Sequence, residues 1–479
     1  MFHDGRMSND GLGCLCPIDE AFNYEGEFWD DLSGKHLRKE GVIEARKLEI
    51  KCFHEHTVYI KTPLTECHEV TGKGPIGVKW IDINKGDEVN EEYRSRLVAQ
   101  EINYGKTENL FAATPPLEAK KTLFSLAVTE GFGYGPGWQY KLEFIDVKRA
   151  YFYAPAKRDV YVKLPDEDYE EGMCGKLNKS MYGTRDAAYN WEVEYVRFMN
   201  SVGFVHGKTS PCIFYHSGKD IRCVIYGDDF TLLGSEVALD WFRKSIKATY
   251  EVSVKGRLGA DDKDDKSVRL LNRVIEWTKD GISYEADQRH AEIIVKQLGT
   301  QASQAVSSPG HKINPKLFIG NDGDLLKPEQ ASMYRALSAR ANYLSQDRSD
   351  IRFSVKELCR RMSQPRQIDW KQLLVMGRYL IGRMRVINKF DYQKNWKIID
   401  TWTDTDHAGC METRKSTSGG IIMLGNHPLK HWANTQSIVS LSSGEAEYYG
   451  CVRAGSATMG YKSMLEDLNV KDKWQRGGA

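Results

Sequence analysis

The feature that most constrains this chain is a pair of adjacent carboxylates at the tip of an expected hairpin. Asp228 and Asp229 follow a Tyr-Gly pair, and apolar runs at 221–225 and 230–233 flank the turn. Apolar runs on both sides of a glycine-containing turn predict two strands joined by a tight connection. A Gly-Asp-Asp turn is common in solvated loops, so the hairpin needs a second observation before it indicates chemistry.

That second observation is an acidic position upstream. The apolar segment 141–147 carries Asp146, and the aromatic pair Tyr151 and Phe152 follows it. Transfer of a phosphoryl group to a primer 3′-hydroxyl uses two divalent ions about 4 Å apart, and Mg²⁺ prefers oxygen ligands. Aspartates delivered from neighbouring strands of one sheet can supply such ligands. The sequence therefore predicts the centre of a polymerase palm.

With these two sites the chain resembles the reverse transcriptases of copia-type long-terminal-repeat retrotransposons. Further matching segments follow in the family's order from about Gly74 onward. They are 93–100, 111–116 and 179–188 in the expected fingers and palm, 334–344, 348–351 and 378–380 in the expected connection, and 403–409, 414–420 and 440–448 in an expected ribonuclease H unit. The resemblance implies an α+β multidomain fold: a right-hand polymerase with fingers, palm and thumb or connection, followed by a truncated ribonuclease H-like α/β unit.

The resemblance also implies four segments. They are an N-terminal extension at 1–73, fingers and palm at 74–255, a thumb and connection-like region at 256–395, and a partial ribonuclease H-like domain at 396–479. Local patterns predict a hairpin at 79–98 and helices near 40–51, at 117–130, at 186–202 and in two pieces across 331–387.

The catalytic residues that the resemblance implies are Asp146, Asp228 and Asp229. Two Mg²⁺ or Mn²⁺ ions would be held by Asp146, Asp228 and the backbone of Val147, with Asp229 as a supporting carboxylate. Tyr226 is expected near the primer terminus. The alternative is a set of exposed strand-end acids with no catalytic role.

Nucleotide binding is expected from a second set of residues. Tyr151 falls where reverse transcriptases place a ring against the sugar, and a ring there excludes the 2′-hydroxyl of a ribonucleotide. Phe152 would support that ring, and Tyr182 with Gly183 aligns with the surface under the sugar. Candidates for the triphosphate are Lys85, Arg94 and Arg96. The alternatives are core packing for the rings and solvated charges for the cations.

The last segment predicts an incomplete ribonuclease H site. Asp404 and Glu447 match its first two carboxylates, and Asp406 is a candidate to lie beside them. We expect strands at 397–403, 419–424 and 438–441 and a helix from Glu447 to about 468. Such a site uses two metal ions and about four carboxylates. The only Asp residues after Glu447 are Asp467 and Asp472. The expected set of carboxylates is therefore incomplete, and we expect this unit to be inactive.

Composition restricts the setting of the protein. No run of about 18 apolar residues and no secretory signal pattern is visible, so we expect no membrane association. Ten scattered cysteines indicate reduced thiols. Net charge is +1, but 340–391 is rich in Lys and Arg, either as a solvated helical face or as a contact with template and primer. We expect an intracellular, cytoplasmic location in a virus-like particle, with nuclear access.

Two main functions fit these patterns. The first is an RNA-directed DNA polymerase of a retrotransposon, whose partners are an RNA template, a DNA or tRNA primer, deoxynucleotides and other Pol segments such as integrase and protease. The second is a catalytically inactive or domesticated remnant that binds nucleic acid. A third is a non-enzymatic fragment that needs its polyprotein neighbours to fold.

Overall fold

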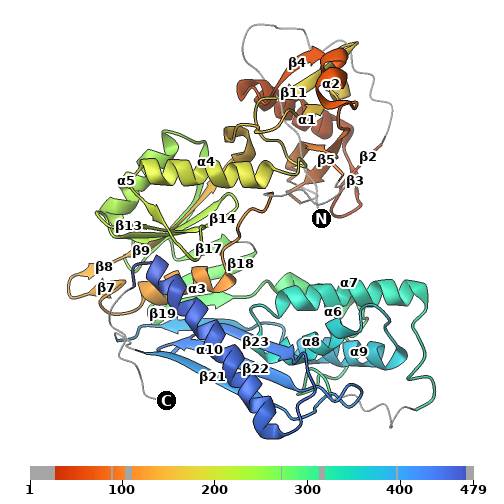
Figure 1. Ribbon diagram of the computed structural model, residues 1–479, viewed down its shortest axis with the longest axis vertical. Coiled ribbons are helices and arrows are strands. Elements are labelled where there is room, and N and C mark those ends of the chain that lie inside the picture. Colours follow the sequence, from red (N-terminus) through yellow and green to blue (C-terminus); the bar gives the residue numbers. More distant parts are fainter. Residues whose placement is uncertain are drawn as a thin grey trace.

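The structure of the 479-residue chain is a computed structural model that describes residues 27–87, 90–102, 110–270, 272–311, 319–394 and 398–470. Figure 1 shows three levels, with the N-terminal region at the top, a central sheet in the middle, and a helical unit beside a C-terminal sheet at the bottom. Residues 1–26 of the expected extension, and Asp472, lie outside the described residues.

The upper region contains the segment where the fingers are expected. It contains β2 (Phe28–Trp29), β3 (His36–Leu37), α1 (Lys39–Glu55), β4 (Tyr59–Pro63), α2 (Leu64–Thr71), β5 (Val78–Asn84), β6 (Tyr93–Ala99), β10 (Tyr161–Val162) and β11 (Met173–Leu177). β5 and β6 form the expected hairpin. However, β4 pairs with β11, and α1 packs against β6. Residues 39–71 therefore pack with the expected fingers, and the boundary expected at residue 73 does not separate two folding units.

The palm is a six-stranded antiparallel sheet in the order β12-β13-β14-β15-β9-β16. Its strands are β9 (Lys141–Val147), β12 (Val205–His206), β13 (Ile213–His216), β14 (Ile221–Tyr226), β15 (Asp229–Gly234) and β16 (Val252–Leu258). Helices α4 (Ala187–Ser201) and α5 (Glu236–Lys247) cover one face, because Trp191, Phe198 and Phe242 bury their rings there. The helix expected at 186–202 is confirmed.

Helix α3 (Leu117–Ala127) forms within the range 117–130 where a helix was expected. It lies on the other face of the palm. Every residue from Glu118 to Ala127 is buried, since α3 also contacts the C-terminal sheet through β23. A helix that is enclosed on all sides is an internal element. α3 therefore joins the palm to the C-terminal unit.

The region between palm and C-terminal unit contains one sheet and a helical cluster. Its elements are β17 (Ser267–Leu270), β18 (Arg273–Thr278), β19 (Gly281–Glu285), α6 (Gln288–Gln297), α7 (Pro328–Leu344), α8 (Arg352–Arg360), α9 (Gln367–Gly382) and β20 (Ile387–Asp391). The two helical pieces expected across 331–387 are instead three helices and the start of β20. The chain leaves the helix after α7 because the buried carboxylate of Asp347 accepts hydrogen bonds from Arg273 and Tyr284, which lie far away in sequence.

The C-terminal unit is a three-stranded sheet covered by one long helix. Its elements are β21 (Ile399–Thr405), β22 (Thr417–Leu424), β23 (His427–Thr435) and α10 (Ser443–Asp467). The third strand expected at 438–441 is wrong: Gly425 adopts a φ of 59° and turns the chain directly from β22 into β23.

Among the described helices, none is long and apolar enough to cross a membrane.

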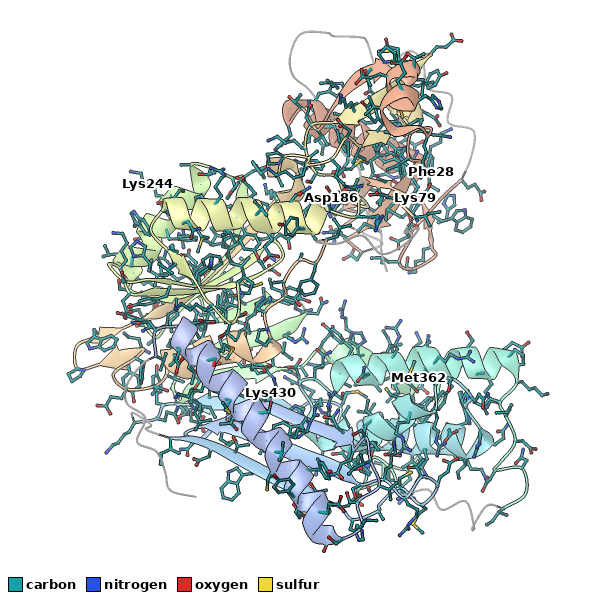
Figure 2. All side chains as sticks on the ribbon, in the orientation of Figure 1. Phe28, Lys79, Asp186, Lys244, Met362 and Lys430 are labelled. Atoms are coloured by element: carbon teal, nitrogen blue, oxygen red, sulfur yellow. The ribbon has the colours of Figure 1, made fainter. Side chains whose placement is uncertain are left out.

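One hydrophobic core runs through the palm and the C-terminal unit. Phe144 on β9, Phe124 on α3 and Leu465 on α10 belong to the same buried cluster. The ion pair between Lys430 and Glu118 links β23 to α3 beside this core, and Figure 2 labels Lys430 where α10 crosses the sheet. The C-terminal unit is therefore packed onto the palm as part of one body.

Candidate active site

The three aspartates expected to be catalytic lie together at one end of the palm strands. Asp146 on β9 pairs directly with Asp229 at the start of β15. Asp228 occupies the two-residue turn between β14 and β15, with Gly227 at a φ of 63°. Glycine adopts that conformation at low cost. The register of the sheet therefore brings the three carboxylates together.

Two hydrogen bonds from neighbouring elements hold this turn. The indole Nε1 of Trp191 donates to the carbonyl of Gly227 at 2.9 Å, and the backbone N–H of Val147 donates to the carbonyl of Asp228 at 2.9 Å. Trp191 is itself buried in the core under the palm. The hairpin is thus fixed to a rigid helix and to the strand that carries Asp146, whereas the metal contact of the Val147 backbone stays a prediction.

The electrostatics of the site follow from this crowding. Burial, and then the negative charges of Asp146 and Asp229, raise the pKa of Asp228 to about 6. Closely spaced carboxylates raise one another's pKa because each disfavours the ionised form of its neighbour. The group therefore offers closely spaced oxygen ligands, which is the kind of environment that binds a cation.

Two lysines that the sequence analysis missed also lie at this site. Lys255 donates hydrogen bonds to Asp146 at 2.8 Å and to Asp229 at 2.6 Å. Lys120 on α3 is buried with its ammonium 5.2 Å from the centre of the Tyr226 ring, and burial lowers its pKa to about 8. The glycine directly after Lys255 was the available signal, since an isolated glycine inside a strand pattern indicates a bulge.

The residues fit a metal ion by their chemistry. Within the described ranges, no group of three or more His, Cys, Asp or Glu side chains is gathered closely enough to hold one as the side chains stand. The ammonium of Lys255, however, is a cation that Asp146 and Asp229 already bind together. The carboxylates of the palm therefore attract positive charge to the position where metal ligands are expected.

Three of the expected nucleotide residues form a cluster on the side of the expected fingers. The guanidinium of Arg96 lies 4.6 Å from the ring centre of Tyr182, whose ring centre is 4.7 Å from that of Tyr151. Burial, and then the charge of Asp228, raise the pKa of Tyr151. The structure thus brings Tyr151, Tyr182 and Arg96 together beside the aspartates.

The remaining residues that are expected to bind the nucleotide are Phe152, Gly183, Arg94 and Lys85. Phe152 is fully buried and packs behind Tyr182. Gly183 has a φ of 86°, and a side chain there would meet the carbonyl of Ala99. Arg94 shares one face of β6 with Arg96, because alternate residues of a strand point to the same side. Lys85 is exposed beyond the end of β5.

The ribonuclease H residues are arranged differently. Glu447 accepts a hydrogen bond from the backbone of Thr405 at 3.3 Å, one residue from the exposed Asp404. Asp406 accepts from the backbone of Thr417 at 2.7 Å. Asp467 accepts three backbone hydrogen bonds from the palm loop 208–210. Asp467 therefore joins α10 to the palm rather than lying beside Asp404.

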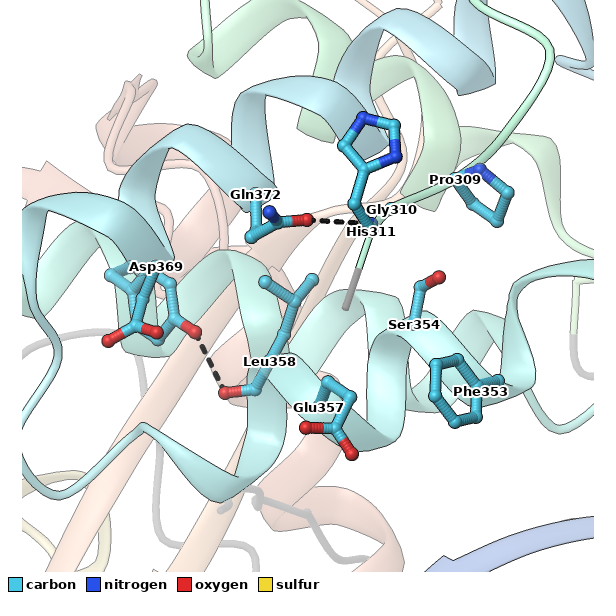
Figure 3. A pocket seen from close by; sticks show the side chains of 10 residues that line it. Pro309, Gly310, His311, Phe353, Ser354, Glu357, Leu358, Asp369 and Gln372 are labelled. Atoms are coloured by element: carbon cyan, nitrogen blue, oxygen red, sulfur yellow. Dashed lines mark hydrogen bonds between the residues drawn. The ribbon is translucent and has the colours of Figure 1, made fainter. Parts of the chain in front are cut away.

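The pocket in Figure 3 is too small to suggest a second chemistry. The pocket in Figure 3 lies among α8, α9 and the segment 309–311, and its volume of about 20 Å³ suits a single water at most. In it, Gln372 accepts a hydrogen bond from the backbone of His311 at 3.0 Å.

The Lys and Arg side chains of the basic segment 340–391 are largely paired with other groups of the protein. For example, Arg385 pairs with Glu285. These pairs favour the interpretation as a solvated, internally paired face.

Comparison with known proteins identifies the family. The family model described as reverse transcriptase (RNA-dependent DNA polymerase) matches residues 66–260, a range that contains all three aspartates. A retrovirus-related Pol polyprotein from transposon TNT 1-94 of Nicotiana tabacum is 23% identical over 455 residues, which cover 91% of this chain. An uncharacterized mitochondrial protein of Arabidopsis thaliana is 30% identical over 231 residues, which cover 47% of this chain and 88% of that protein. The chain belongs to the reverse transcriptases of copia-type retrotransposon Pol polyproteins.

The chain corresponds to only part of the polyprotein and of the solved structure that it resembles. This reverse transcriptase chain spans 32% of the length of the TNT 1-94 polyprotein. A solved structure of the foamy viral protease-reverse transcriptase in complex with RNA/DNA hybrid is 11% identical, with a TM-score of 0.47, and covers 89% of this chain and 47% of that chain.

Proposed function

We propose that this chain copies RNA into DNA by extending a primer with deoxynucleotides. The observation that carries the proposal is the pairing of Asp146 with Asp229 across β9 and β15, with Asp228 in the adjoining turn. Two divalent ions bound there would activate the primer 3′-hydroxyl and neutralise the triphosphate. Asp146 and Asp228 would hold them, together with the backbone of Val147.

The protein's own residues would supply the remaining requirements. Tyr151 would lie against the sugar and exclude a 2′-hydroxyl, and Arg96 would offer a charged contact to the triphosphate. Trp191 keeps the turn that carries Asp228 in place through its bond to Gly227. The rings and the turn are therefore positioned before substrate arrives, which lowers the cost of orienting it.

Primer extension on RNA and DNA templates, with Mg²⁺ or Mn²⁺, tests the proposal. We expect extension by the wild-type chain and a loss of at least about 100-fold in Asp228→Asn, because an anionic ligand is removed. Asp280→Asn is the matched control, since Asp280 lies in the exposed turn between β18 and β19. Nucleic-acid binding without any extension would instead support the inactive, nucleic-acid-binding remnant.

We also propose that the C-terminal unit does not cleave RNA. Of the acids considered for its site, Asp404 and Glu447 are the two expected ligands, Asp406 accepts a hydrogen bond from the backbone of Thr417, and Asp467 is bound to the palm. Two carboxylates are too few to hold two Mg²⁺ ions. The support that this unit gives to the palm core is then its main role.

A further inference from the structure

The ammonium of Lys255 places a positive charge beside the carboxylates of the proposed metal site. Its Nζ lies 2.8 Å from Oδ1 of Asp146 and 2.6 Å from Oδ1 of Asp229. An oxygen that accepts a hydrogen bond from an ammonium is a weaker ligand for a metal ion, and the ammonium repels an approaching dication. Lys255 and a divalent ion therefore compete for the same oxygens.

The backbone at Lys255 accounts for this reach. β16 follows β9 in regular register as far as Val254, and the register shifts between Val254 and Gly256. Lys255 is the extra residue in this β-bulge, and a bulge re-aims the side chain that it carries. The lysine is thereby directed across β9 to the aspartates of two strands.

Lys255 is also able to leave the aspartates. Its side chain is 30% exposed, and its flexible four-carbon stem allows the ammonium to turn into solvent. Lys120, the other lysine beside these aspartates, is more than nine-tenths buried on α3 and cannot move in this way. The site therefore has one fixed positive charge and one exchangeable positive charge.

We propose that Lys255 is an internal counter-ion that a divalent ion must displace from Asp146 and Asp229, and that it weakens metal binding by the protein alone. The inference rests on the proposed polymerase function, because it concerns the same carboxylates. Lys255 acts here as a positioning residue that sets how readily the aspartates accept a metal ion.

Mn²⁺ binding to the full chain, without nucleic acid or nucleotide, provides the first test. Electron paramagnetic resonance of free Mn²⁺ gives the dissociation constant directly. We expect Lys255→Met to tighten binding about tenfold, because one repelling charge is removed. Lys255→Arg, which keeps the charge, should bind like the wild type. Lys371→Met is the matched control, since Lys371 pairs with Asp322 in the helical unit.

A second test uses the wild-type chain, so it does not depend on the variants folding. Brief acetylation followed by peptide mass spectrometry reports how accessible each lysine is. We expect Mg²⁺ to increase acetylation of Lys255 and to leave Lys371 unchanged. Equal or weaker Mn²⁺ binding by folded Lys255→Met, or Lys255 acetylation that does not respond to Mg²⁺, would overturn the proposal. Neither measurement uses primer extension, so a failure of polymerase activity is detected separately.

Discussion

The carboxylate of Asp467, at the end of α10, accepts a hydrogen bond from the backbone N–H of Ser210 at 3.0 Å. The same side chain accepts from the backbone of Lys208 at 2.8 Å and of Thr209 at 3.0 Å. A single acid of the C-terminal unit thus satisfies three donors of a palm loop. The two units are joined by polar contacts as well as by their common core.

The first prediction concerns this connection. Asp467→Asn removes the charge that strengthens the three hydrogen bonds, and we expect it to lower the free energy of unfolding by about 1 to 3 kcal/mol. Urea unfolding followed by tryptophan fluorescence measures the change. Glu466→Gln is the control, because Glu466 is exposed on the neighbouring position. Equal stabilities of the two variants would contradict the structural role of Asp467.

The second prediction uses the raised pKa of Asp228. An acid whose pKa is raised to about 6 on folding holds its proton more tightly in the folded state. Ionised Asp228 therefore costs stability above pH 6, and the cost disappears below about pH 4, where the unfolded state is also protonated. We expect Asp228→Asn to raise stability at pH 7 by about 1 kcal/mol, allowing for solvent screening, and to give no gain at pH 4.

Thermal unfolding from pH 4 to pH 8, in the presence of a chelator, checks this. Asp220→Asn is an informative control at the opposite end of β14. Although burial opposes it, the charge of Arg222 lowers the pKa of Asp220, so its ionised form stabilises the fold. The two identical substitutions should therefore shift stability at pH 7 in opposite directions. A loss of stability in both would show that Asp228 is not strained by its neighbours.

The third prediction concerns sugar selection. Tyr151→Val removes the ring next to Tyr182 that would collide with a 2′-hydroxyl. We expect the relative use of ribonucleotides over deoxynucleotides to rise by about 10-fold or more, corresponding to about 1.4 kcal/mol. Single-nucleotide incorporation kinetics give the ratio. The exposed Tyr169 provides a control, Tyr169→Val. If discrimination is the same in both variants, Tyr151 is a packing residue only.

The fourth prediction is that the chain does not cleave the RNA strand of an RNA–DNA hybrid. Asp404 and Glu447 are the two expected ligands among the described carboxylates, and two carboxylates are insufficient for two Mg²⁺ ions. A labelled hybrid incubated with Mg²⁺ or Mn²⁺, beside an authentic ribonuclease H, measures the activity. Cleavage that is lost in Asp404→Asn would require another group, or a partner chain, to complete the site.

Some of this structure was predictable because it follows from local pattern. The apolar spacing of α4 and the polar turn between β5 and β6 are visible in the sequence, and both elements form as expected. The hairpin with Asp228 and its pairing with the strand of Asp146 were also expected, since the apolar runs and acids are adjacent in each segment.

Other features depend on register and long-range contact, which local pattern does not contain. The position of Lys255 results from a bulge that exists only in the pairing of β16 with β9. The contact of Asp467 with Ser210 joins residues 257 positions apart. No local pattern therefore indicates a partner for this carboxylate. The break after α7 likewise depends on Asp347 meeting Arg273. In each case a tertiary partner decides what the residue does.

The enclosure of α3 has a consequence for how the protein is made. Thr122 on α3 bonds to Tyr461 on α10 at 2.9 Å, across 339 residues of sequence. The ribosome synthesises α3 long before α10, so the nascent palm carries an uncovered apolar surface until α10 has emerged. Long-range contacts of this kind slow folding and expose intermediates to aggregation. We therefore expect chaperones that shield that surface until α10 has emerged to raise the yield of folded protein.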